Sequence, residues 1–249
     1  MMQNPLFPPR SDWVAPDVLP DLSSASRIAI DLETKDPKLK VSGPGWATGN
    51  GHVTGIAIAT DGWSGYLPIR HEGGGNLDAN FVFKWLEKTL SSRCDKIFHN
   101  ALYDVGWLKR EGILLNGKIH DTVIAAPLID ENRRQYSLNS LGFDYCGEVK
   151  DETLLTEAAK SFGIDPKAEM YKLPAKFVGL YAEQDAVLTL KLWDKLKNLL
   201  ETQKLEPIYD LESSLIPLLI EMRWRGVRVD VNKAEETTVK LKQKEKVCL

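Results

Sequence analysis

Residues 27–34, RIAIDLET, predict a buried β-strand that carries two acids. Side chains alternate between the two faces of a strand, so Asp31 and Glu33 share one face and the isoleucines and the leucine share the other. The two carboxylates then lie roughly 7 Å apart along the strand, and each raises the cost of ionising the other. A Mg²⁺ ion would make such a pair favourable, because it prefers carboxylate, water and phosphate oxygens. On this stretch alone, a solvated strand end with surface charge is the alternative interpretation.

The overall composition is typical of a globular protein with a substantial core. The 249 residues suffice for one large domain, or for one domain with an appendage, and 43% of them are hydrophobic and 27% charged. The formal net charge of -3 indicates no strongly basic surface of the kind that coats duplex DNA. Nucleic acid is still allowed as a partner, because bound metal ions offset the charge of an acidic cluster.

Cysteine usage and hydropathy predict a cytosolic protein. Cys94, Cys146 and Cys248 are odd in number, far apart and without CxxC spacing, which fits thiols in a reducing compartment. The first residues lack the apolar core of a signal peptide. The apolar run 215–220 is too short to cross a membrane and contains Pro217, so no membrane partner is expected.

The order of apolar patterns predicts an α/β domain with a mixed sheet. Strands are expected at residues 27–34, 53–60, 64–69, 96–99 and 118–120, and helices at 76–91, 101–111, 122–129, 137–145, 153–162, 176–202, 211–225 and 232–246. Asp61-Gly62 predicts a hairpin, which makes the first three strands an antiparallel meander. Residues 35–51 show no helix or strand period, Pro207 interrupts the helical pattern, and Asn100 is expected to cap the helix that follows it.

Two further places put an acid where burial is expected. Asp104 lies one turn into the helix that leaves the fourth strand, and strand ends in α/β folds face a shared crevice. Tyr181 and Asp185 are four residues apart on the apolar face of the long helix 176–202. A buried carboxylate is costly without a partner, so Asp185 alone indicates either a metal ligand or a salt-bridged core acid.

Together these pieces resemble a known enzyme family. DLET at 31–34, HNALYD at 99–104 and YAEQD at 181–185 are similar, in this order, to the three motifs of the DnaQ-like (DEDD) 3'-5' exonucleases whose last motif is Tyr-x-x-x-Asp. The resemblance covers residues 25–205. It implies the RNase H-like fold, in which helices flank a mixed five-stranded sheet.

Other segments narrow the resemblance to the proofreading domain of phage-type family A DNA polymerases. They are Asp36-Pro37, the GPG loop at 43–45, YLPI at 66–69, Asp121-Thr122 and the segment 211–230. The prolines of residues 1–22 predict an extended leader without regular structure. The resemblance implies an exonuclease domain at 23–205 and a helical stub at 206–249 like the start of a polymerase thumb. Polymerase activity is not expected from this chain. The expected location is the cytoplasm of a bacterium or of a phage-infected host.

The chemistry that the resemblance implies is hydrolysis of the last phosphodiester at a 3' end of DNA, with two divalent ions, Mg²⁺ or Mn²⁺, as cofactors. By resemblance, Asp31 contacts both ions, Glu33 and Asp185 complete the tighter site, and Asp104 holds the second ion largely through water. Tyr181 orients the attacking water, since a hydroxyl with a pKa near about 10 is a poor base at neutral pH. The four acids and Tyr181 are the predicted catalytic residues, and the four acids are the predicted metal ligands.

Residues beside these motifs are predicted to contact the terminal nucleotide. They are Leu32, Thr34, His99, Asn100 and Tyr103. For Tyr103 core packing is the favoured alternative, and His99 alternatively ends a strand. Asp121 is interpreted as a helix cap and not as a ligand. The expected partners are a single-stranded or frayed 3' end of DNA and a polymerase domain or other replication proteins.

Two alternatives keep the fold but change the function. An RNase D-like exonuclease shares the three motifs and trims RNA, and the thumb-like tail argues against it. A catalytically silent domain of a polymerase only binds nucleic acid, and such a domain is expected to have lost some of its carboxylates.

Overall fold

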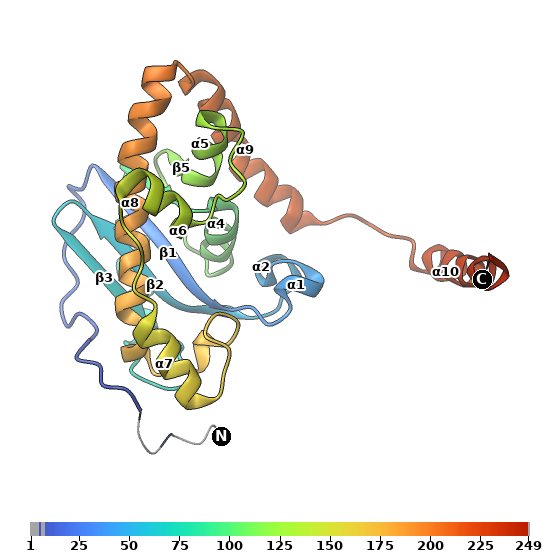
Figure 1. Ribbon diagram of the computed structural model, residues 1–249, viewed down its shortest axis with the longest axis horizontal. Coiled ribbons are helices and arrows are strands. Elements are labelled where there is room, and N and C mark those ends of the chain that lie inside the picture. Colours follow the sequence, from blue (N-terminus) through green and yellow to red (C-terminus); the bar gives the residue numbers. More distant parts are fainter. Residues whose placement is uncertain (1–4, 6–7, 249) are drawn as a thin grey trace.

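A mixed five-stranded sheet forms the centre of the molecule (Figure 1). The computed structural model describes residue 5 and residues 8–248. Residues 1–4, 6 and 7 of the predicted leader, Leu249 and the side chain of Cys248 lie outside the described part. The strands are β1 (Arg27–Lys35), β2 (His52–Thr60), β3 (Trp63–Pro68), β4 (Asp95–Phe98) and β5 (Ile119–Asp121). Their order is β3-β2-β1-β4-β5, antiparallel from β3 to β1 and parallel from β1 to β5. The predicted meander and mixed sheet are confirmed.

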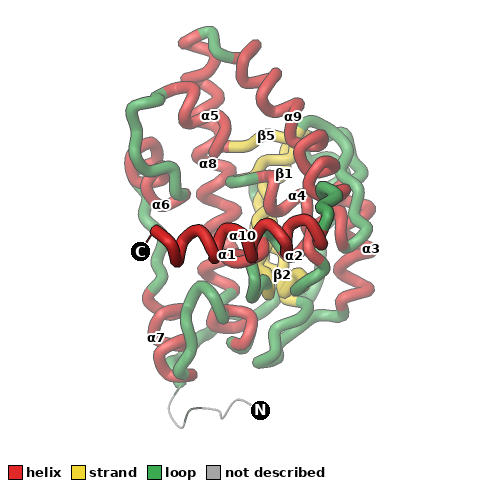
Figure 2. The backbone as a smooth tube through the Cα atoms, turned by 90° about the vertical axis from the view of Figure 1, so that its right-hand side faces the viewer, coloured by secondary structure: helices red, strands yellow, loops and turns green. Residues whose placement is uncertain are grey.

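Helices cover both faces of this sheet. The longer ones are α3 (Ala79–Leu90), α4 (Ala101–Arg110), α5 (Thr122–Ile129), α7 (Thr153–Phe162), α8 (Gly179–Gln203), α9 (Glu206–Arg225) and α10 (Val231–Cys248). The short ones are α1 (Leu39–Ser42), α2 (Gly45–Thr48) and α6 (Leu138–Leu141), which continues as a π-helical turn, Gly142–Cys146. Figure 2 shows α6, α7 and α8 on one side of the strands and α3, α4 and α9 on the other.

Two predictions about loops are wrong. Residues 35–51 are not structureless, because they contain α1 and α2, and Asp36 joins α2 to the end of β1 by accepting a hydrogen bond from Gly45 N at 2.9 Å. These helices are single turns, too short for a helical period to be visible in the sequence. Pro207 does not interrupt a helix. It lies in the first turn of α9, where a missing N–H is tolerated, so α9 begins earlier than predicted.

The two faces of β1 belong to two different cores. Ile28, Ile30 and Leu32 pack in a core that also contains Leu86 of α3, Phe98 of β4, Trp107 of α4 and Ile216 of α9. Ala29 faces the other core. Most of the buried residues of α8 belong to this core. This division confirms the alternation predicted for residues 27–34. Because the second face carries small residues, alanine at 29, 57 and 59, α8 lies directly against the sheet.

The leader is fastened to the start of α8 although it forms no helix or strand among the described residues. The Trp13 indole Nε1 donates a hydrogen bond to Glu183 Oε1 at 2.8 Å. The indole lies so close to Gly179 that a Cβ there would be 2.0 Å from a ring atom. Only glycine therefore allows the leader to reach the first turn of α8.

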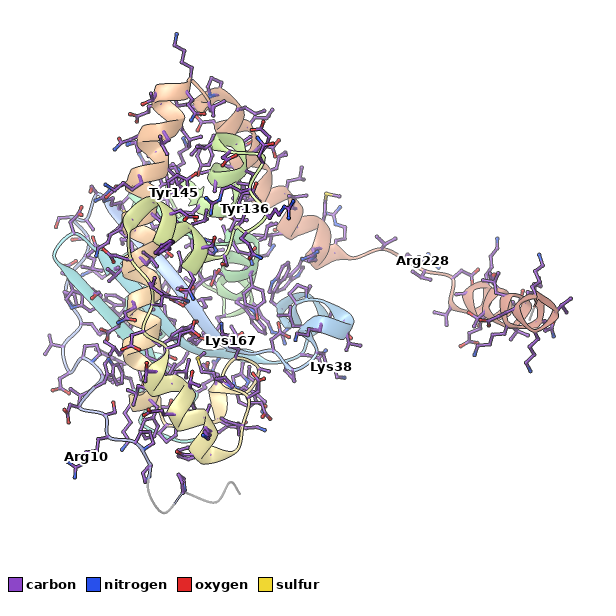
Figure 3. The ribbon with its side chains drawn as sticks, in the orientation of Figure 1. Arg10, Lys38, Tyr136, Tyr145, Lys167 and Arg228 are labelled. Carbon is purple, nitrogen blue, oxygen red and sulfur yellow. The ribbon has the colours of Figure 1, made fainter. Side chains whose placement is uncertain are left out.

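The helix α9 packs on the sheet domain, whereas α10 does not. Tyr209, Ile216 and Ile220 of α9 are almost fully buried against neighbouring elements that include α4, α5 and β5. Beyond α9, every residue from 226 to 247 is exposed, and α10 extends away from the sheet (Figure 1). Arg228 marks the connecting segment in Figure 3. None of the described helices has both the length and the apolar character that a membrane span requires.

We expect Tyr209→Phe to lower the free energy of unfolding by about 1 to 3 kcal/mol. The Tyr209 hydroxyl accepts a hydrogen bond from the backbone N–H of Asp121 at 3.0 Å, and its loss leaves that buried donor unsatisfied. Urea denaturation measures the change, and Leu211→Ala on the exposed face of α9 is the control. Equal stability of Tyr209→Phe and the wild type would show that this contact does not couple α9 to the sheet.

Candidate functional site

Three carboxylates from β1 and α8 meet on the α8 side of the sheet. Asp31 and Glu33 come from the second face of β1, and Asp185 comes from the buried side of α8. One oxygen from each carboxylate lies within 4.8 Å of the other two. Across β2, Asp31 pairs with Ala57 and Glu33 pairs with Gly55, and the Tyr66 side chain of β3 lies over Gly55. The structure thus brings together residues that lie far apart in the sequence.

Asp104 lies beside this trio, in the first turn of α4. Its Oδ1 accepts a hydrogen bond from Leu32 N at 3.0 Å, so it contacts β1 between Asp31 and Glu33. Asp104 is only 4% exposed, and burial together with the Asp31 carboxylate raises its pKa well above the usual range. All four predicted acids are therefore close to β1, although Asp104 is not a member of the trio whose oxygens meet.

A buried aspartate, and not the predicted cap, holds the turn before Asp104. Asn100 has a φ of +78°, and its side chain makes no capping hydrogen bond, so the prediction that it caps α4 is wrong. Asp121 instead accepts hydrogen bonds from the N–H groups of Asn100 and Ala101, at 2.9 and 2.7 Å. Asp121 also accepts one from Val123 N at 2.9 Å, which confirms it as the cap of α5. The Asn100 side chain remains exposed beside the site.

Burial and crowding disfavour the ionised forms of these acids. Burial, with the Asp185 carboxylate nearby, raises the pKa of Asp31 to about 7. Burial also raises the pKa of Asp185 and, with help from Asp31, that of Glu33. The ammonium group of Lys150 lowers the pKa of all three. The site therefore favours either protons or cations.

Lys150 is a site residue that the sequence analysis missed. Its Nζ lies 2.7 Å from Oδ1 and 2.9 Å from Oδ2 of Asp185, and it donates a hydrogen bond to the Tyr181 hydroxyl at 3.2 Å. Burial and the Asp185 carboxylate raise the pKa of Tyr181 well above its usual value, so the hydroxyl keeps its proton at neutral pH. Lys150 stands in the loop before α7, where no periodic pattern marks it, and only the fold places it at the site.

The five predicted nucleotide contacts have different surroundings. The Tyr103 hydroxyl hydrogen-bonds to Thr34 Oγ1 at 2.8 Å and to Asp36 Oδ2 at 3.0 Å, and the residue is half-buried. His99 Nδ1 lies 2.7 Å from a threonine hydroxyl of α5, and burial lowers its pKa to about 4, so the imidazole is neutral at pH 7. Leu32 lies in the core, 6% exposed. Contact with a nucleotide stays a prediction for each of the five.

The donor set fits a hard divalent cation. All four acids offer carboxylate oxygens, the ligands that Mg²⁺ and Mn²⁺ prefer. Asp185 Oδ1 is buried and has no hydrogen-bond partner of suitable geometry, although the Lys150 ammonium lies nearby. An ion bound through this oxygen would satisfy it and would offset the charge of Asp31 and Glu33 as well.

We expect Asp31→Asn to make the protein more stable than the wild type at pH 8 in EDTA, by about 1 to 4 kcal/mol. Because the pKa of Asp31 is raised to about 7, the folded state binds this proton more tightly than the unfolded state. The wild type therefore loses stability as the pH rises from about 4 to about 7, and asparagine, which has no such proton, does not.

Thermal melts from pH 4 to pH 8 measure this difference, which should nearly vanish at pH 4. Asp17→Asn, at an exposed position of the leader, is the matched control. A difference between Asp31→Asn and the wild type that does not change with pH would contradict the raised pKa of Asp31.

Comparisons with known proteins agree with this geometry. The family model described as 3'-5' exonuclease matches residues 15–201. The chain is 43% identical over 244 residues to a DNA-directed DNA polymerase of Pseudomonas phage M6. The match covers 94% of this chain and 36% of that protein. It is also 31% identical over 220 residues to the DNA polymerase DpoZ of Salmonella phage PMBT28. This match covers 86% of this chain and 33% of that protein. The chain spans about a third of the length of these relatives.

Solved structures share the fold. One is the POL domain of Pol1 from M. smegmatis, with a TM-score of 0.62 and 19% identity over 89% of this chain and 32% of that one. Another is Brucella melitensis NrnC with bound Mg²⁺, with a TM-score of 0.59 and 20% identity over 85% of this chain and 94% of that one. A third is the exoribonuclease RNase D of Escherichia coli, with a TM-score of 0.56 and 16% identity over 83% of this chain and 47% of that one.

These likenesses confirm the predicted RNase H-like fold, and the family model extends over most of the chain. The two sequence relatives named above are DNA polymerases of phages, and the carboxylate cluster of this chain lies inside residues 15–201, which the family model matches. The chain belongs to the family of 3'-5' exonuclease domains found in family A DNA polymerases.

Proposed function

We propose that this chain is a divalent-metal-dependent 3'-5' exodeoxyribonuclease that proofreads for a family A DNA polymerase. One observation carries the proposal: oxygens of Asp31, Glu33 and Asp185 lie within 4.8 Å of one another although they come from β1 and α8. Such a cluster is unfavourable unless cations bind to it, and phosphodiester hydrolysis is the reaction that uses bound cations in this family.

The four acids are the proposed ligands of two Mg²⁺ or Mn²⁺ ions. Asp31, Glu33 and Asp185, whose oxygens meet, would hold the ions, and Asp104, beside them, would contribute a further ligand oxygen. When bound, the ions supply the Lewis acidity that activates a water and stabilises the leaving 3' oxygen. The bound Mg²⁺ of NrnC, which shares the fold, favours Mg²⁺ for this chain.

Tyr181 is the proposed positioning group for the attacking water. Burial keeps its hydroxyl protonated, so it donates a hydrogen bond to the water and does not remove a proton from it. The hydroxyl accepts a hydrogen bond from Lys150 Nζ at 3.2 Å, which leaves its own proton for a second partner.

The proposed binding site of the terminal nucleotide lies at the end of β1 and the start of α4. The candidates are Leu32, Thr34, His99, Asn100 and Tyr103. Thr34 and Tyr103 are joined by a hydrogen bond, so a base that stacks on the tyrosine meets a ring of fixed orientation. Stacking does not depend on base identity, which suits an exonuclease that removes any terminal nucleotide. The polymerase relatives favour DNA over RNA as the substrate.

The proposed division of the chain into segments is supported by the greater length of the polymerase relatives. Residues 1–22 form a leader and residues 23–205 the exonuclease domain, and residues 206–249 begin a polymerase thumb. The polymerases that the chain matches are much longer, which supports a polymerase domain as the partner of the exonuclease. The cytoplasm of a phage-infected host is the proposed place of action.

We expect the purified protein to shorten 5'-labelled single-stranded DNA from its 3' end in the presence of Mg²⁺. EDTA and Asp31→Ala should each abolish the ladder of products, because each prevents metal binding. An RNA of the same sequence separates the alternatives, since a preference for RNA would favour the RNase D-like function. Absence of cleavage by well-folded protein would contradict the exonuclease proposal.

We expect Tyr181→Phe to lower the single-turnover rate about a hundredfold, because the water loses its orienting hydroxyl. Rapid-quench measurements with saturating Mg²⁺ and DNA give this rate. The control is Tyr136→Phe, which removes a hydroxyl bonded to the carbonyl of Asp130. A rate for Tyr181→Phe equal to that of the wild type would remove Tyr181 from the mechanism.

A further inference from the structure

One basic side chain lies among the carboxylates of the site. The side chain of Lys150 is 8% exposed, and its Nζ lies 2.7 and 2.9 Å from the two oxygens of Asp185. Nζ also lies 4.6 Å from the centre of the Tyr181 ring. Among the residues that the structure describes, no other basic side chain forms an ion pair with Asp31, Glu33 or Asp185. Lys150 thus supplies the site with a positive charge that belongs to the protein itself.

The loop that carries Lys150 is fastened to α8 independently of this side chain. Glu148 accepts hydrogen bonds from Lys191 Nζ at 2.7 and 2.9 Å. On the other side of Lys150, the backbone N–H of Asp151 donates to Gln184 Oε1 at 3.2 Å. One contact is between side chains and the other holds the backbone at Asp151, so the loop keeps two links to α8 that do not involve the Lys150 side chain.

The surroundings give the Lys150 side chain somewhere to move. A cavity of about 300 Å³ lies between this loop and α8, and Lys150, Val149, Gln184 and Val187 line part of it. A lysine side chain has four rotatable bonds between backbone and charge, so its ammonium group can leave one anion without a change in the backbone. The contact between Lys150 and Asp185 is therefore able to open.

We propose that Lys150 is a built-in counter-ion that competes with the metal for Asp185: it holds Asp185 and Tyr181 before a divalent ion binds, and it releases the carboxylate when the ion arrives. The inference rests on the proposed metal-dependent function. An ammonium group and a divalent ion at the same carboxylate repel each other, because two positive charges then lie at short range. Lys150 therefore lowers the metal affinity of the site, and a bound metal weakens the hold of Lys150 on Asp185 by the same factor.

Lys150 is a positioning residue in this scheme, because it acts through Asp185 and Tyr181. It removes much of the repulsion between the carboxylates while no metal is bound, and so it keeps the ligands in place. The cost is a weaker apparent affinity for the metal. A site without Lys150 would bind the ion more tightly but would be less stable in its absence.

Calorimetric titration with Mn²⁺ in the absence of DNA tests this proposal. The variants are Lys150→Met, which keeps the apolar stem and removes the charge, and the control Lys84→Met, which removes an exposed lysine of α3 on the opposite side of the sheet. We expect Lys150→Met to bind Mn²⁺ about tenfold more tightly than the wild type. We also expect it to melt at a lower temperature in EDTA. Lys84→Met should bind Mn²⁺ with the affinity of the wild type.

Unchanged or weaker Mn²⁺ binding by folded Lys150→Met overturns the proposal, since competition predicts only a gain. Should Lys150→Met not fold, Lys150→Arg and Lys150→Gln take its place, and the neutral glutamine variant must then bind Mn²⁺ more tightly than the arginine variant. Equal affinities of that pair overturn the proposal as well. A wild type that binds no Mn²⁺ is a separate result, because it removes the metal-dependent function itself whatever Lys150 does.

Discussion

The structure depends on the cost of holding four carboxylates close together, two of them buried and two half-buried. Asp104 and Asp185 are 4% and 5% exposed, and burial raises the pKa of each acid in the site. Two contacts reduce this cost within the chain itself: Leu32 N donates to Asp104, and Lys150 pairs with Asp185. Neither removes it, so the carboxylates would separate if the scaffold allowed them to.

The scaffold prevents this because both elements that carry the trio are fixed on their other sides. Ile28 and Ile30, on the face of β1 away from the acids, are fully buried. The first turns of α8 are held by Trp13, which lies on Gly179 and donates to Glu183. The described residues of the leader form no helix or strand, yet Trp13 restrains the helix segment that carries the tyrosine and the last acid of the site.

How far the sequence predicts this site depends on whether a contact is local. Asp31 and Glu33 share a face because strands alternate, and this period is visible in eight residues. Asn100 has the residue type of a helix cap, but the acceptor for its turn is Asp121, 21 positions further on, which no local pattern reveals. Lys150 lies 35 positions before Asp185, in a loop without a period, so its role depends on packing alone. The fold and the acids were therefore predictable, and their supports were not.

The same reasoning applies to α9, which lies beyond the region matched by the family model. Tyr209 accepts a hydrogen bond from the backbone of Asp121, whose carboxylate binds the turn at Asn100 and Ala101. That turn begins α4, and one turn later Asp104 contacts β1 between the two acids of the strand. A short series of hydrogen bonds thus connects α9 to the site. The segment that follows the region matched by the family model therefore contributes to the support of the site.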